Sequence, residues 1–249
     1  MTARTMLVEE WRMTLTPKRS TCGGLAVRIA GERCVLRCSG AMHVVEHDVL
    51  IVADLHLEKG SAFAMRGQML PPYDSAATLA RLEEEVATVN PARVVLLGDS
   101  FHDSRSIPRM AETDRETLER MAFGRDWLWL EGNHDREALG TDLARLPGSV
   151  IDTLSLGALR LVHEPQPGDQ PGEVAGHLHP SARVAAYGRG VRKPCFVTDG
   201  SRIILPAFGA FTGGLNVRDP VIASLFASPP LAAVPGRDQV HAIAWSSLV

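Results

Sequence analysis

The sequence lacks long apolar runs and has few cysteines, and both features limit the class of protein to which it can belong. No segment is apolar enough to span a membrane, and Glu9 and Glu10 lie where a signal peptide would need an apolar core. Of the 4 cysteines, none forms a CxxC pair, and a strand would hold Cys34 and Cys38 roughly 13 Å apart, too far for a disulfide. We therefore expect a cytoplasmic protein without membrane contact, whose cysteines are reduced, buried thiols.

Lysine is also scarce, and the chain has no excess of positive charge. The 26 basic residues include only three lysines, Lys18, Lys59 and Lys193, and the net charge is −3. No strong basic field exists to hold nucleic acid non-specifically. Any affinity for nucleic acid must come from a local patch or from bound metal ions.

The 249 residues fit one large domain with a substantial core. We expect an N-terminal arm over residues 1–20 and a single domain over 21–249. Apolar periodicity and capping residues predict helices over 73–90, capped by Asp74 or Ser75, and over 108–121. Strands are expected over 25–31, 32–38, 42–54, 93–97, 126–130, 150–162 (two strands around Gly157), 174–176, 203–205, 221–226 and 241–245, and a proline-rich loop over 228–236.

Five polar clusters follow these predicted strands at the points where apolar runs give way to loops. They are Asp54-Leu-His56, Gly98-Asp99, Gly132-Asn133-His134-Asp135, His163 and Gly176-His177-Leu-His179. Loops at strand ends on a rigid sheet are where sites are built in α/β proteins. The glycines before Asp99, Asn133 and His177 permit close approach of the backbone.

Carboxylate and imidazole together suit Mn²⁺, Fe, Zn²⁺ or Co²⁺, and no cysteine takes part. The clusters hold more potential ligands than one tetrahedral ion can use, so two adjacent ions are expected. Five of the nine histidines fall inside the clusters. Of the other four, we interpret His43, His47 and His241 as core or exposed histidines without a catalytic role.

The ordered pattern D-x-H, G-D, G-N-H-D, H and G-H-x-H over residues 54–179 resembles the calcineurin-like metallophosphoesterase superfamily. The resemblance implies an α/β fold, a β-sandwich of two mixed sheets flanked by helices. It also implies one metal on Asp54, His56, Asp99 and His179, and a second on Asp99, Asn133, His163 and His177, with Asp99 bridging. His134 would act on the scissile phosphate and Asp135 would orient His134. Glu164 follows His163 where many family members have glycine.

A narrower resemblance covers the segments 54–74, 98–103, 130–135, 163–165 and 176–180. They are similar to the bacterial ligase-associated DNA damage response endonucleases (the PdeM family). This resemblance implies a manganese-dependent enzyme in DNA repair, with DNA as substrate and a DNA ligase, a helicase and an exonuclease as partners.

Further site residues are expected near the first two clusters. The segment GDSFHD also resembles recombination nucleases of the SbcD type, which makes His102 a second candidate for acting on phosphate or a partner to a metal ligand. Lys59, Arg66 and Gln68 follow the first cluster on one loop and are candidates for substrate binding.

Two readings of the activity stay open. Two divalent ions would activate water and neutralise the phosphate, while His134 stabilises the transition state or protonates the leaving oxygen. This chemistry serves a DNA endonuclease and equally a phosphatase or phosphodiesterase for a nucleotide or other small molecule. A non-catalytic scaffold would have lost ligands, and none is lost.

Overall fold

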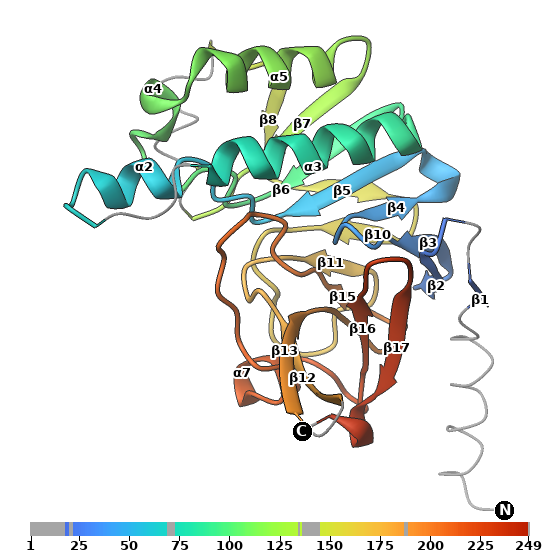
Figure 1. Cartoon of the computed structure of the whole chain (residues 1–249). Coiled ribbons are helices and arrows are strands. Elements are labelled where there is room, and N and C mark those ends of the chain that lie inside the picture. Colours follow the sequence, from blue (N-terminus) through green and yellow to red (C-terminus); the bar gives the residue numbers. More distant parts are fainter. Residues whose placement is uncertain are drawn as a thin grey trace, which may run out of the picture.

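The computed structural model of the chain describes residues 18–19, 22–68, 73–133, 135, 145–186 and 189–248. Two mixed sheets face each other, and helices cover the outer face of the first sheet (Figure 1). The predicted sandwich of two mixed sheets flanked by helices is therefore confirmed. No helix within these ranges is long and apolar enough to cross a membrane.

The first sheet has the order β1-β2-β3-β4-β5-β6-β7-β8, antiparallel from β1 to β5 and parallel from β5 to β8. Its strands are β1 (Lys18–Arg19), β2 (Leu25–Ile29), β3 (Glu32–Leu36), β4 (Met42–Val44), β5 (Val49–Ala53), β6 (Arg93–Leu97), β7 (Asp126–Leu130) and β8 (Ser149–Ile151). Its helices are α2 (Lys59–Ala64), α3 (Asp74–Val89), α4 (Ser106–Arg109) and α5 (Glu112–Ala122).

The second sheet has the order β17-β16-β14-β15-β11-β10-β9, in which β10, β11 and β15 run parallel. Its strands are β9 (Leu154–Leu156), β10 (Leu159–Leu161), β11 (Glu173–Ala175), β14 (Phe196–Thr198), β15 (Ile203–Ile204), β16 (Leu231–Pro235) and β17 (Val240–Ala244). A two-stranded ribbon of β12 (Ser181–Ala186) and β13 (Arg189–Pro194) and the short α7 (Pro220–Ala223) complete this half. Two 3-10 turns cover Val45–His47 and Trp245–Ser247.

Strand β5 is buried on both faces, and its alternating side chains belong to two different cores. Val49, Ile51 and Ala53 pack between the two sheets, whereas Leu50 and Val52 pack against the helices. The helical side contributes Leu79, Leu82 and Val86 of α3 and Leu118 and Met121 of α5. A strand fixed in this way holds the residue that follows it, Asp54, in a defined position.

Most predicted elements are observed, with some differences at their boundaries. The run 42–54 is two antiparallel strands, because Asp48 adopts a left-handed conformation that closes a turn between them. The predicted helix 108–121 is broken by an extended Ala111, which leaves α4 and α5. Three short strands, not two, fill 149–161, and the turn at Gly157 separates the last two.

Three sequence predictions are wrong. Residues 221–226 contain α7 in place of a strand, because the Asp219 side chain accepts a hydrogen bond from Val221 N and Pro220 starts the helix. Leu231–Pro235 in the expected proline-rich loop is a strand paired with β14 and β17. Neither Asp74 nor Ser75 caps α3: the Asp74 carboxylate accepts from Gly60 N at 2.8 Å and so ties α2 to α3, and the Ser75 hydroxyl donates to Glu58.

The N-terminal arm and the cysteines are tested only in part. Lys18–Arg19 pair with β2, and residues 1–17 lie outside the described residues. The four cysteines form no disulfide with one another, as expected, but Cys22 is exposed and Cys38 is half-buried, whereas Cys34 and Cys195 are buried.

Candidate metal centre

The polar clusters of the sequence meet where parallel strands of both sheets end. Asp54 follows β5, Asp99 follows β6, and His163 and His177 follow β10 and β11. A bridge between Ala53 and Ala207 joins the two sheets at this edge, and Phe208 N donates to Ala53 O at 2.7 Å. The site therefore lies at the carboxyl ends of parallel strands, where α/β folds place their ligands.

Two groups of possible metal ligands form there. Asp54, His56 and His179 make the first group, and Asp99, His163 and His177 make the second. Within each group the ligand atoms lie within 4.8 Å of one another. Asp54, His56, Asp99 and His163 are buried, while the rings of His177 and His179 are half-buried. His177 and His179 are therefore the ligands most accessible to solvent.

The spacing of the ligand atoms fits a bound ion in each group. In the first group, His179 Nε2 lies 3.2 Å from His56 Nε2 and 3.4 Å from Asp54 Oδ1. In the second, His163 Nε2 lies 3.2 Å from His177 Nδ1 and 3.4 Å from Asp99 Oδ1. Ligand atoms that each lie about 2.0–2.2 Å from one ion are roughly 3.0–3.5 Å apart from one another. The residues therefore fit two divalent metal ions.

Hydrogen bonds from the backbone orient both groups. Asp54 accepts from His177 N through both carboxylate oxygens, at 3.2 and 2.9 Å. His56 N donates to Asp99 O at 2.9 Å, and so connects the loops after β5 and β6. The backbone is left-handed at six of the loop residues: Asp54, His56, Glu58, Asp99, His177 and His179. Such strain clusters at functional sites when the surrounding structure enforces it.

The glycines before the ligands have the predicted role. A Cβ on Gly98 would lie 2.0 Å from His163 Nδ1, and one on Gly132 would lie 2.1 Å from Asp99 N. Any side chain at these positions would occupy space that the site residues fill. Close approach, and not only turn formation, therefore requires glycine here.

The carboxylates make the centre attractive to cations. Burial disfavours a charged His163, but its hydrogen bond to Asp99 and the charges of Asp54 and Asp99 outweigh that effect and raise the pKa of His163. The raised pKa reflects a negative local field, which would favour a bound cation in the same way.

Asp135 links the loops that follow β6 and β7. Its buried carboxylate accepts hydrogen bonds from Ser100 N at 3.0 Å, Phe101 N at 2.9 Å and Gly132 N at 3.2 Å. Burial raises the pKa of Asp135 to about 6, although these amide hydrogen bonds oppose the shift. Asp135 thus fixes the segment that carries Asp99. His134, the residue that Asp135 is predicted to orient, lies outside the described residues.

Of the other predicted site residues, some lie at the metal centre and others lie on the surface away from it. His102 lies beside the first group, with its ring centroid 6.3 Å from that of His56 and 5.7 Å from that of Phe63. Asn133 lines a hollow beside His163. Lys59 donates to Phe211 O at 3.0 Å, while Arg66 and Gln68 are exposed beyond the end of α2. The structure brings His102 to the centre and leaves Arg66 and Gln68 on the surface.

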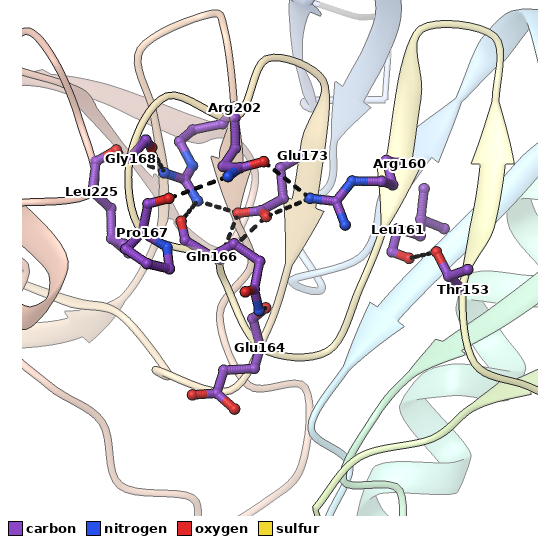
Figure 2. A network of polar contacts seen from close by, with 11 residues as sticks. Thr153, Arg160, Leu161, Glu164, Gln166, Pro167, Gly168, Glu173, Arg202 and Leu225 are labelled. Carbon is purple, nitrogen blue, oxygen red and sulfur yellow. Dashed lines mark hydrogen bonds and ion pairs between the residues drawn. The ribbon is translucent and has the colours of Figure 1, made fainter.

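Three features near the centre were not found from the sequence. Glu58 is buried and bonds to Ser75 and Ser61, which anchors α2 beside the site. Glu173 and Arg202 form a buried network behind the loop that follows His163 (Figure 2). Arg192 of the ribbon β12–β13 lines the same cavity as His179. These residues carry no motif, and only the tertiary pairing of distant segments brings them here.

The comparisons with known proteins agree with this geometry. Residues 47–190 match the family model for the calcineurin-like phosphoesterase. The chain is similar to the solved structure of the nuclease MPE of Pseudomonas putida, with 31% identity and a TM-score of 0.68 over 88% of this chain and 100% of that chain. It is also similar to YfcE, a phosphoesterase from E. coli, with 16% identity and a TM-score of 0.41 over 79% and 98% of the two chains.

No curated protein matches the chain. The family model covers more than half of the 249 residues, and the similarity to the Pseudomonas putida nuclease spans that whole chain. The chain therefore belongs to the calcineurin-like phosphoesterase family and is a hydrolase of phosphate ester bonds.

Proposed function

We propose that the protein is a two-metal-dependent endonuclease that hydrolyses phosphodiester bonds in DNA. The observation that carries the proposal is the pair of ligand groups, Asp54/His56/His179 and Asp99/His163/His177, side by side at one edge of the sandwich. Asp99 contributes to both metals, Asn133 completes the second set, and Mn²⁺ is the proposed ion. When bound, the two ions supply an activated water and neutralise the phosphate oxygens.

The residues of the chain hold the substrate and move the proton. His134 donates a hydrogen bond to the phosphate oxygens or a proton to the leaving oxygen. Asp135 holds the loop on which His134 lies, through its bonds to Ser100 and Phe101. His102, next to His56, contacts the phosphate from the side of the first group.

Two observations support a polymer as the substrate. Between Asp99 and Asn133 the chain forms only the short helices α4 and α5 and strand β7, so no domain inserted there encloses the centre. The similar protein from Pseudomonas putida is described as a nuclease. An open centre suits a long strand that is not engulfed, and Lys59, Arg66 and Gln68 on α2 and beyond it would bind phosphates of that strand.

The biological setting is proposed from the same similarity. We place the enzyme in cytoplasmic DNA repair, together with a DNA ligase, a helicase and an exonuclease. Affinity for DNA should rest mostly on phosphate contacts, and should therefore be weakly sequence-specific and fall with salt.

Covalently closed circular single-stranded DNA tests the proposal, because a circle has no end for an exonuclease. Incubation with the enzyme and Mn²⁺ should give linear and then shorter DNA. Asp99→Ala should give none, while His241→Ala, at an exposed position outside the centre, should cleave normally. Circles that survive while nucleotide or sugar phosphate esters are hydrolysed would replace the endonuclease with a small-molecule phosphoesterase.

A further inference from the structure

A cavity of about 210 Å³ lies directly beside the first ligand group. Its lining includes His179, the end of the ribbon with Ser181 and Arg192, and the loop with Thr212 and Gly214. The ligand His179 is therefore shared by the metal centre and the cavity. A molecule bound to the centre through its phosphate can extend into this space.

Two cationic residues line the cavity. Lys193 lines it together with Arg192, and none of the described lining residues is Asp or Glu. Arg192 Nε donates to Ser181 Oγ at 2.6 Å and Nη2 donates to Gly214 O, both of which are neutral acceptors. These bonds fix the guanidinium without neutralising it.

The ribbon itself adds positive charge. Arg183 lies directly opposite Arg192 in the antiparallel register of β12 and β13. Like charges that face each other across two strands destabilise the pair. Among the described residues no carboxylate forms an ion pair with Arg183, Arg192 or Lys193. A bound anion would relieve this repulsion.

The other flank of the metal centre carries acidic residues in place of basic ones. Among the residues that the structure describes, the hollow beside His163 and Asn133 is lined by Glu131 and Glu164 and by no Lys or Arg. The Glu164 carboxylate points away from the polar network behind it (Figure 2). A polyanion would be repelled there and attracted on the flank of Arg192.

We propose that the cavity holds the phosphate next to the scissile one in a single DNA strand, with Arg192 as its main ligand. The proposal rests on the proposed function and adds a direction: the strand leaves the centre across the ribbon β12–β13 and avoids the flank of Glu131 and Glu164. The Nη1 group of Arg192 takes no part in the bonds to Ser181 and Gly214, so this side of the planar guanidinium can donate to phosphate oxygens.

The test compares substrates with and without a neighbouring phosphate. Arg192→Ala should raise KM for a single-stranded 12-nucleotide DNA by about tenfold and leave hydrolysis of bis-p-nitrophenyl phosphate, which has one phosphate, nearly unchanged. Without added metal, fluorescence anisotropy should show weaker binding of the same DNA, with a salt slope reduced by about 0.7. Arg192→Lys should recover part of the affinity. Arg237→Ala removes an equal charge from the turn between β16 and β17 and should change neither measurement.

The outcomes separate this inference from the proposed function. If the wild type cleaves DNA, and Arg192→Ala matches Arg237→Ala in both KM and binding, the cavity is not a phosphate site although the endonuclease stands. An equal loss on both substrates would also overturn the inference, because Arg192 would then support the centre and not the neighbouring phosphate. If the wild type hydrolyses only the small ester while Arg192→Ala still weakens DNA binding, the phosphate site stands and the endonuclease fails.

Discussion

The guanidinium of Arg202 and the carboxylate of Glu173 form an ion pair in which the side chains are 2% and 0% exposed. Arg202 also donates to the backbone oxygens of Gln166, Gly168 and Leu225. Glu173 accepts from Gln166 N as well (Figure 2). The pair thereby closes the loop between His163 and β11, and it connects the metal centre to the interior of the second sheet.

Removing one partner of this pair should destabilise the fold. Arg202→Met leaves the Glu173 charge buried with fewer partners and should lower the free energy of unfolding by about 3–5 kcal/mol. Arg93→Met, which breaks the exposed pair with Asp126, should cost about 0–1 kcal/mol. Urea denaturation of the two variants measures the difference. Equal losses would mean that the buried network contributes no more than a surface ion pair.

Gly98 and Gly124 provide a matched pair for testing close approach at the centre. Both have a φ of 72°, so alanine at either position carries a similar backbone strain of about 1–2 kcal/mol. Only at Gly98 would the Cβ meet His163; nothing lies within 4 Å at Gly124. Gly98→Ala should therefore lose metal affinity and activity, while Gly124→Ala loses only stability. Equal metal affinity in the two variants, measured by calorimetry, would refute the steric argument.

Metal binding itself should require two equivalents. The protein freed of metal by a chelator should bind two Mn²⁺ ions, and His177→Ala and His179→Ala should each lose one, since the two histidines belong to different groups. Saturating Mn²⁺ should also raise the melting temperature, because the ion binds only the folded site. Elemental analysis counts the ions. Full activity with a single equivalent would disprove the two-metal centre.

The sequence predicted the centre better than its surroundings, for a physical reason. Asp54, Asp99, His163 and His177 each follow an apolar run that becomes a buried strand, so local pattern alone fixes where they emerge. The position of Arg192 beside the cavity that His179 also lines depends on the register of the ribbon and on the loop with Gly214, which no local pattern encodes. The spacing of the motifs therefore identifies the candidate metal ligands, whereas the residues around them are set by tertiary packing.

The same contrast between local pattern and tertiary packing explains why some elements of the fold were predicted wrongly. Asp219 and Pro220 start a helix directly before the apolar run 221–226, which by itself indicates a strand. Leu231–Pro235 is a strand because β14 and β17 pair with it from both sides. The local pattern predicts Asp74 or Ser75 as the cap of α3, but tertiary partners bind both side chains: Gly60 N donates to Asp74, and Ser75 donates to Glu58. Local propensity is overridden where distant segments supply the partner.

The four cysteines should differ sharply in reactivity. Burial raises the pKa of Cys34 to about 12 and also raises that of Cys195, so neither thiol ionises near neutral pH. Iodoacetamide at pH 8 should label the exposed Cys22 first and the half-buried Cys38 slowly. Cys34 and Cys195 should react only after unfolding in urea. Mass spectrometry of the labelled peptides measures each rate, and rapid native labelling of Cys34 would contradict its burial.

His134 should serve the reaction and not the binding of metal. The two ligand groups form from Asp and His residues without His134, and Asp135 already holds the loop through Ser100 and Phe101. His134→Ala should therefore keep two metal equivalents and a normal melting temperature, but lose rate by about 10²–10⁴. Asp135→Asn provides the comparison: it should weaken the loop and lower stability, because its amide accepts fewer of the three backbone hydrogen bonds.

The leaving group decides between the two roles of His134. If it protonates the departing oxygen, His134→Ala should slow an alkyl phosphodiester far more than a p-nitrophenyl one, because the aryl oxide leaves without a proton. An equal loss on both esters would assign His134 to stabilising the charge on the phosphate oxygens. Loss of metal together with activity would show that His134 is a ligand, and the assignment of the centre to the remaining seven residues would then be wrong.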